Sequence, residues 1–352
     1  MSASAPAPDN IVELRDVTVL LGGGKRWLRP AVPPVRAVGG VSVDVRRGEI
    51  LGLVGESGCG KTTLGRTILG LQRETAGDIR LDGAAVGGLL PKQARRQRGD
   101  IQYVHQDAAA ALDPWWSIGH TLEEGLRIHG VADRKERGRR VDEILEAVGL
   151  DRTARPRYPH ELSGGQLRRV ALARILVLHP RFVILDEPTS GLDMSVQATV
   201  LNLLLELRGR FGLTYLFISH DLSVVRRFCG RVAIMYLGRI VELAGADEIF
   251  AAPRHPYTRA LLAAVPRLDG PQRRPVAIAG EPPSAARLPP GCVFSSRCPH
   301  VEDACRERQP ELEQDGEHAV ACRRWRDILP ESGPTPATGE PNGPELARSL
   351  AD

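Results

Sequence analysis

Gly55-Glu56-Ser57-Gly58-Cys59-Gly60-Lys61-Thr62-Thr63 is the stretch that decides the fold of this chain. A short apolar run, residues 49–54, precedes it, and a helical pattern begins at Lys61. Glycines let backbone N–H groups curl around phosphate oxygens, and the positive end of the helix dipole points at them. Lys61 would neutralise phosphate charge, and the Thr62 hydroxyl would bind Mg²⁺. A loop of this length can also be a simple turn, but the Lys-Thr-Thr sequence and the flanking strand and helix favour phosphate binding.

A second apolar run, residues 182–185, reads as a buried parallel strand and ends in two carboxylates, Asp186 and Glu187. Asp186 would hold Mg²⁺ through water. Glu187 points elsewhere because side chains alternate along a strand, and it could take a proton from the water that attacks the γ-phosphate. Such a run alone is weak evidence, since many strands end in acidic residues. Its value comes from sharing a chain with the phosphate loop.

A third stretch, Leu162-Ser163-Gly164-Gly165-Gln166, precedes a helical run over residues 167–178. A serine and two glycines at a helix N-terminus can bind an anion, although they also suit an ordinary helix cap. Ser-Gly-Gly-Gln before a helix resembles the signature motif of ATP-binding-cassette (ABC) ATPases. In a chain that also carries the two motifs above, this resemblance is decisive.

The other parts of an ABC site follow by resemblance, in the family's order. Gln106 resembles the glutamine that senses Mg²⁺ and couples to the membrane subunits, and His220 resembles the histidine that contacts the γ-phosphate. Ser190-Gly191-Leu192-Asp193 resembles the D-loop. The resemblance implies catalytic roles for Glu187, His220 and Gln106, a Mg²⁺ site at Thr62, Gln106 and Asp186, and ATP contacts from Gly55 to Thr63, from Ser163, Gly164, Gly165 and Gln166, and from Asp193.

In this family two ATPase domains pair head to tail, so the resemblance implies that ATP lies between the phosphate loop of one subunit and the Ser163 loop of the other. Closure on ATP and opening after hydrolysis would drive the membrane subunits. Asp113-Pro114-Trp115-Trp116 lies where the family docks those subunits, although core packing is an equal interpretation for one tryptophan. The family's usual adenine-stacking aromatic is missing from residues 19–22, and Trp27 is a candidate substitute.

The chain divides into four parts. Residues 1–10 and 327–352 have the composition of disordered tails. Residues 11–250 are expected to form an α/β P-loop domain of the ABC type, with a helical subdomain inserted at about residues 103–178 and a loop over residues 22–34. Residues 251–326 are rich in proline and are expected to form a small irregular domain ligated by cysteines.

Four of the six cysteines cluster in that last part: Cys292, Cys298, Cys305 and Cys322. Four thiolates suit Zn²⁺ or a [4Fe–4S] cluster, and four unligated thiols are the simpler alternative. The surrounding sequence, at residues 255–262, 291–299 and 318–322, resembles the C-terminal part of oligopeptide and dipeptide importer ATPases. That branch carries the iron–sulfur cluster, so the resemblance favours it over zinc.

The resulting interpretation is the ATPase subunit of an importer for peptides or similar solutes, at the cytoplasmic face of the membrane. The resemblance implies a second, unlike ATPase subunit rather than a homodimer, two membrane permeases and, indirectly, an extracytoplasmic solute-binding protein. Aromatic residues make up only 4% of the chain and the basic clusters lie outside recognition motifs, which argues against nucleic-acid binding. No secretory signal or spanning segment is apparent. The alternative is an ABC ATPase of DNA repair or translation, and the solute itself stays open.

Overall fold

The computed structural model describes residues 9–26, 29–87, 91–105, 112–264 and 280–328. Its centre is an eight-stranded sheet in the order β13-β14-β12-β11-β5-β10-β9-β8. Five neighbouring strands run parallel: β11 (Arg231–Tyr236), β5 (Ile50–Val54), β10 (Thr214–Ser219), β9 (Phe182–Asp186) and β8 (Ile101–Val104). The parallel α/β architecture predicted from the sequence is therefore confirmed.

Helices cover both faces of these strands, which is why β5, β9 and β10 are buried along their whole length. Phe217 of β10 packs on Phe228 of α7 (Leu222–Phe228), with ring centroids 4.8 Å apart. The next residue, Ile218, lies on the opposite face near Gly65 of α1 (Lys61–Ile68). Because the strands are parallel, the residues that follow β5, β9 and β10 all lie at one edge of the sheet.

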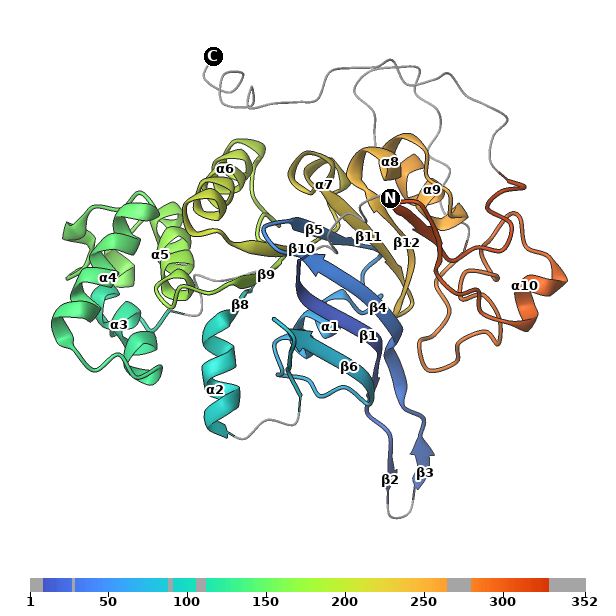
Figure 1. The fold of residues 1–352 in the computed structure, drawn as a ribbon, viewed down its shortest axis with the longest axis horizontal. Helices are drawn as coiled ribbons and strands as arrows, with labels where there is room; N and C mark the ends of the chain where they lie inside the picture. Colours follow the sequence, from blue (N-terminus) through green and yellow to red (C-terminus); the bar gives the residue numbers. More distant parts are fainter. Residues whose placement is uncertain (1–8, 27–28, 88–90, 106–111, 265–279, 329–352) are drawn as a thin grey trace, which may run out of the picture.

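A separate antiparallel sheet, β4-β1-β6-β7, packs beside the central one. It contains β1 (Asn10–Leu21), β4 (Val35–Arg46), β6 (Ala76–Leu81) and β7 (Ala84–Ala85). The stretch expected to be a loop, residues 22–34, contains instead a hairpin of β2 (Gly24–Arg26) and β3 (Arg29–Val32). The long pair β1 and β4 leads directly into this hairpin, so its backbone extends the pairing despite the glycines and prolines (Figure 1).

The helices α3 (Ile118–Ile128), α4 (Arg134–Ala147) and α5 (Gly164–Leu176) lie together at one end of the molecule (Figure 1). Short 3-10 turns, Arg152–Ala154 and Pro159–Glu161, connect α4 to α5, and α2 (Pro91–Asp100) precedes β8. Tyr103 and Val104, which the sequence analysis assigned to the helical part, belong to β8 of the central sheet. Among the described helices, α6 (Met194–Phe211) included, none has the length and apolar character that a membrane crossing requires.

The C-terminal segment lies at the opposite end from α3–α5 (Figure 1). It includes α8 (Ala246–Ala251), α9 (Pro256–Ala263), α10 (Asp303–Glu307), β13 (Glu313–Asp315) and β14 (His318–Val320). Because β14 pairs with β12 (Arg239–Gly245), this segment extends the central sheet. The expectation of a small irregular domain did not include this junction.

A buried carboxylate, Glu242 of β12, holds the junction together. Its side chain is fully buried and accepts hydrogen bonds from the backbone N–H groups of Arg254 (2.6 Å) and His255 (3.0 Å). His318 Nε2 of β14 lies 2.7 Å from Glu242 Oε1. Burial alone would raise the pKa of Glu242, but His318 and these N–H groups outweigh it and hold the pKa below its usual value.

We predict that Glu242→Gln destabilises the chain by about 2 kcal/mol at pH 7, because an amide cannot accept all these bonds. A lowered carboxyl pKa contributes stability above the unfolded-state value and loses it as the pH falls. The difference in free energy of unfolding between wild type and variant should therefore shrink as the pH falls below the ordinary value of 4.5. Denaturant unfolding at several pH values measures it. Glu311→Gln, at a largely exposed carboxylate, is the control, and a pH-independent difference would contradict the prediction.

Candidate nucleotide-binding site

The loop between β5 and α1 packs so closely on its neighbours that two of its glycines have no room for a side chain. A Cβ on Gly55 would lie 2.1 Å from the carbonyl oxygen of Met235, and one on Gly60 would lie 2.1 Å from that of Ala37. Gly60 also has a φ of +108°, which L-residues rarely adopt. Gly58 has a φ of +78° but open space around it. The loop is thus pressed against β11 and β4 on one side and open on the other.

Lys61 is buried at the start of α1, and the loop itself holds its ammonium group. Lys61 Nζ donates to the carbonyl oxygens of Gly55 (2.7 Å) and Glu56 (3.0 Å). These two carbonyl oxygens hold the positive charge of Lys61 against the loop. Burial raises the pKa of the Cys59 thiol more than nearby Lys61 lowers it, so Cys59 stays a neutral core side chain.

Thr62, in the helix that follows β5, is hydrogen-bonded to Asp186 at the end of β9. Thr62 Oγ1 donates to Asp186 Oδ2 at 2.9 Å, and the Tyr103 hydroxyl donates to the same oxygen. The other oxygen, Asp186 Oδ1, is buried and has no hydrogen-bond partner among the residues that the structure describes. A buried acceptor without a partner is costly unless a ligand satisfies it. Together with the Thr62 hydroxyl, Oδ1 offers the hard oxygen ligands that Mg²⁺ prefers, so these residues fit the ion.

Tyr103 was not among the residues singled out in the sequence. Burial and the Asp186 carboxylate both raise the pKa of its hydroxyl, which therefore remains a hydrogen-bond donor. The available signal was an aromatic residue in a short apolar stretch, residues 101–104, shortly before Gln106. Its contact depends on the parallel register that places Tyr103 beside Ile184 on β9.

Glu187 and His220 come together at the same edge of the sheet. His220 Nδ1 lies 3.1 Å from Glu187 Oε1, and both residues line a cavity of about 130 Å³ with Ser190, Gly191 and Leu192. Glu187 has a φ of +52°, in the left-handed region. This turn directs its carboxylate away from Asp186 and toward His220. The two carboxylates that end β9 thus occupy different environments.

Ser163 caps α5 through a reciprocal pair of hydrogen bonds. Its hydroxyl accepts from the Gln166 N–H (3.3 Å), and Gln166 Oε1 accepts from the Ser163 N–H (3.0 Å). Gly164 and Gly165 are exposed, with open space at both Cβ positions. The helix N-terminus is therefore accessible for an anion. Within this chain α5 packs with α3 and α4, on the side of β9 and β8 (Figure 1).

For several of the predicted site residues the structure shows only local contacts, or does not describe them. Gln106 and Trp27 lie outside the described residues. Asp193 caps α6, where its carboxylate accepts from the Val196 N–H and the Ser195 hydroxyl. Trp115 is 85% exposed, whereas Trp116 packs against His120 with ring centroids 4.3 Å apart. Only Trp115 thus offers its ring to a partner.

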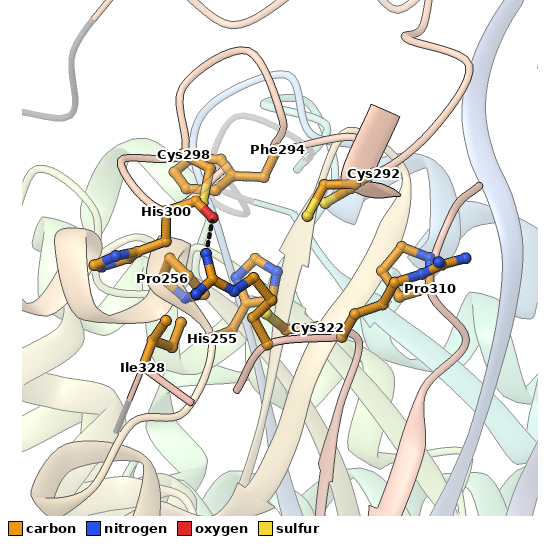
Figure 2. Close-up of a pocket in the computed structure, with 12 residues that line it drawn as sticks. His255, Pro256, Cys292, Phe294, Cys298, His300, Pro310, Cys322 and Ile328 are labelled. Carbon is orange, nitrogen blue, oxygen red and sulfur yellow. Dashed lines mark hydrogen bonds between the residues drawn. The ribbon is translucent and has the colours of Figure 1, made fainter. Parts of the chain in front are cut away.

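The four clustered cysteines line one small cavity of about 20 Å³, together with His255 and His300 (Figure 2). All four are free thiols, and burial raises the pKa values of Cys292 and Cys322 to about 11. Within the described residues, however, no three Cys, His, Asp or Glu side chains are close enough together to hold a metal ion. In this structure the thiols therefore do not form the ligand set of the predicted iron–sulfur or zinc centre.

Comparison with known proteins is consistent with this site. Residues 38–190 match the family described as ABC transporter, and residues 241–305 match the oligopeptide/dipeptide transporter C-terminal region. A putative peptide import ATP-binding protein of Brucella ovis is 51% identical over 81% of this chain and 90% of its own. The oligopeptide transport ATP-binding protein AppF of Bacillus subtilis is 44% identical over 92% and 99%. A dimeric ATP-binding cassette solved in a post-hydrolysis state with ADP and phosphate is 28% identical, with a TM-score of 0.57 over 67% of this chain and 98% of its own.

We predict that Gly60→Ala destabilises the chain by about 3 kcal/mol, since the added methyl group meets the Ala37 carbonyl and the backbone conformation is strained. Gly58→Ala is the matched control in the same loop. It carries only the conformational penalty of about 1 kcal/mol, because its Cβ meets nothing. Denaturant unfolding without nucleotide compares the two variants. Equal losses would show that the packing at residue 60 is looser than described here.

Proposed function

This chain belongs to the ABC transporter family, as an ATP-binding subunit of its peptide-importing branch, and on that premise we propose how its residues bind and hydrolyse ATP. The observation that carries the proposal is the Thr62–Asp186 hydrogen bond beside Asp186 Oδ1, which has no hydrogen-bond partner within the described part of the chain. It prepares a cation site next to a phosphate loop, at the edge of the sheet where Glu187 and His220 also lie. The alternative role in DNA repair or translation is not favoured, because the relatives described above are transport proteins.

In the proposed site the N–H groups of the loop and Lys61 bind the β- and γ-phosphates. Thr62, Asp186 and Gln106 hold Mg²⁺, which when bound neutralises charge on the phosphate oxygens. Glu187 accepts a proton from the water that attacks the γ-phosphorus, while the bond to the ADP oxygen breaks. His220 contacts the γ-phosphate and, at 3.1 Å, orients the Glu187 carboxylate.

The exposed, capped N-terminus of α5 supports a shared site. Because Ser163, Gly164 and Gly165 offer an accessible anion-binding turn, we assign them to the ATP held by the phosphate loop of a second subunit, with Gln166 and the D-loop residue Asp193 beside them. The second subunit is proposed to be an unlike ATPase rather than a second copy. Two membrane permeases and, indirectly, an extracytoplasmic solute-binding protein complete the importer, and this subunit acts at the cytoplasmic face.

The test uses the assembled transporter, purified through a tag on this chain. We predict that Glu187→Gln lowers ATP turnover by about 100-fold or more, because the attacking water loses its base, while ATP stays bound. In a separate variant, Ser163→Arg should abolish ATP hydrolysis at the partner's site, since the bulky cation blocks the helix N-terminus that would bind the partner's ATP. Turnover and bound nucleotide are measured on the same samples. Undiminished hydrolysis in Glu187→Gln, or a complex without membrane subunits, would refute the proposal.

We further propose that the cysteine cavity binds a [4Fe–4S] cluster, with Zn²⁺ as the alternative. The support is that Cys292, Cys298, Cys305 and Cys322 all line one cavity although 30 residues separate the first from the last. Their described spacing does not form a ligand set, so binding requires the thiols to move inward. The role would be structural, because a segment with this little apolar content benefits from a cross-link.

Anaerobically purified protein should then be brown, with broad visible absorbance and equal amounts of iron and acid-labile sulfide. Cys305→Ser should remove the colour, while Cys229→Ser, at an isolated buried cysteine, should keep it. Metal analysis accompanies the spectra. A colourless protein with zinc would replace the cluster by the alternative, and a colourless protein without metal would refute ligation altogether.

A further inference from the structure

Two residues from outside the ATPase domain bind Glu56 of the phosphate loop. Arg297 of the C-terminal segment binds both carboxylate oxygens of Glu56: Nη1 lies 2.8 Å from Oε2 and Nη2 lies 3.2 Å from Oε1. The Tyr257 hydroxyl, from α9, accepts a hydrogen bond from the Glu56 N–H at 3.0 Å. Side chain and backbone of Glu56 are thus fixed by two residues that lie 201 and 241 positions further along the chain.

These contacts are sheltered from water. The Arg297 side chain is 6% exposed and that of Glu56 is 25% exposed, while Tyr257 is fully buried. A bidentate arginine–carboxylate pair in such surroundings is directional and strong, and removal of the Arg297 guanidinium would take its ionic partner away from the Glu56 carboxylate. Burial alone would lower the pKa of Arg297, but Glu56 and Tyr236 raise it, so the guanidinium stays charged.

A cluster of three aromatic rings packs beside the contacts that Arg297 and Tyr257 make with Glu56. The rings of Tyr236, Tyr257 and Phe294 lie within 4.6 to 5.5 Å of one another, centroid to centroid. Tyr236 belongs to β11, and so does the preceding residue, Met235, whose carbonyl oxygen leaves no room for a Cβ at Gly55. Phe294 belongs to the C-terminal segment. The cluster therefore makes one packed unit of the sheet edge, α9 and the turn that carries Arg297.

The backbone of Glu56 connects these contacts to Lys61 in the phosphate loop. Its carbonyl oxygen accepts a hydrogen bond from Lys61 Nζ, at 3.0 Å. The peptide group that carries this carbonyl belongs to the residue whose N–H and carboxylate are held by Tyr257 and Arg297. Any rotation of residue 56 would move an acceptor that positions the Lys61 ammonium, and the loop N–H groups that follow it.

We propose that Arg297 and Tyr257 are positioning residues for ATP binding, through which the C-terminal segment sets the conformation of the phosphate loop. The proposal rests on the proposed function, since it assumes that this loop binds ATP. Arg297 directly precedes Cys298, and its turn begins at Cys292, so Arg297 belongs to the part of the chain whose cysteines line the cavity of Figure 2. ATP affinity is therefore linked to the conformation of that segment.

The experiment measures ATP hydrolysis and equilibrium binding of a fluorescent ATP analogue on the assembled transporter. Arg297→Ala should raise both the KM and the Kd for ATP about tenfold and change kcat by no more than about twofold. The reason is that Arg297 positions the phosphate loop for ATP binding and does not contact the reacting atoms. Arg297→Lys keeps the positive charge but cannot bind both oxygens of Glu56 in the same way, so it should retain part of the affinity for ATP that Arg297→Ala loses. Arg308→Ala removes an exposed ion pair of the same segment and is the matched control, expected to leave both constants unchanged.

Two further variants keep the test decisive if Arg297→Ala fails to fold. Tyr257→Phe retains the ring and loses only the hydroxyl, and should raise the Kd about threefold with little effect on thermal stability. In a Glu56→Gln background, replacing Arg297 with Lys should change the Kd much less than it does in the wild type, since the ion pair is already gone. Unchanged ATP affinity in Arg297→Lys and Tyr257→Phe would overturn the proposal. A wild-type complex that neither binds nor hydrolyses ATP would refute the proposed function instead.

Discussion

The hydrogen bond from Thr62 to Asp186 is the contact on which the nucleotide site depends. Strand β10 lies between β5 and β9, so this bond spans the end of one strand and fixes the phosphate loop relative to the carboxylate. Tyr103 on β8 donates to the same oxygen, which brings a further strand into the same polar edge. Because no described residue bonds to Asp186 Oδ1, this buried acceptor is costly unless the proposed cation satisfies it. Preorganisation of this kind places part of the energetic cost in folding rather than in binding.

The sequence predicts those parts of the site whose chemistry lies in consecutive residues. Glycines at positions 55 and 60 are required because backbone carbonyls lie only 2.1 Å from where a Cβ would be, and this requirement acts at each position separately. Ser163 and Gln166 form their capping box within one turn of helix. Asp186 and Glu187 end a strand that is apolar throughout. Local motifs of this kind carry both the residue types and the geometry that the chemistry needs.

The rest of the site depends on register and on pairing between distant segments, which no local pattern encodes. Tyr103 reaches Asp186 only because β8 and β9 are parallel and align Tyr103 with Ile184. Arg297 resembles any surface arginine until the fold brings it to Glu56. The same reason explains why residues 22–34 were expected to be a loop, since the pairing that forms β2 and β3 is carried by the long strands on either side. The four cysteines were correctly grouped by their spacing, but spacing could not show how far apart their thiols would lie.

The C-terminal segment makes several contacts with the ATPase domain, and two of them link its position to the phosphate loop. At one point Glu242 and His318 fasten β14 to the sheet. At the other, Arg297 and Tyr257 bind the carboxylate and the backbone N–H of Glu56 in the phosphate loop. The cysteine-lined cavity lies beside both contacts, since its lining includes His255, which Glu242 holds, and Cys298, which directly follows Arg297. A segment attached only to the sheet could loosen without consequence for ATP. A segment attached also to Glu56 cannot, because the carbonyl of Glu56 accepts a hydrogen bond from Lys61, the residue proposed to bind the phosphates.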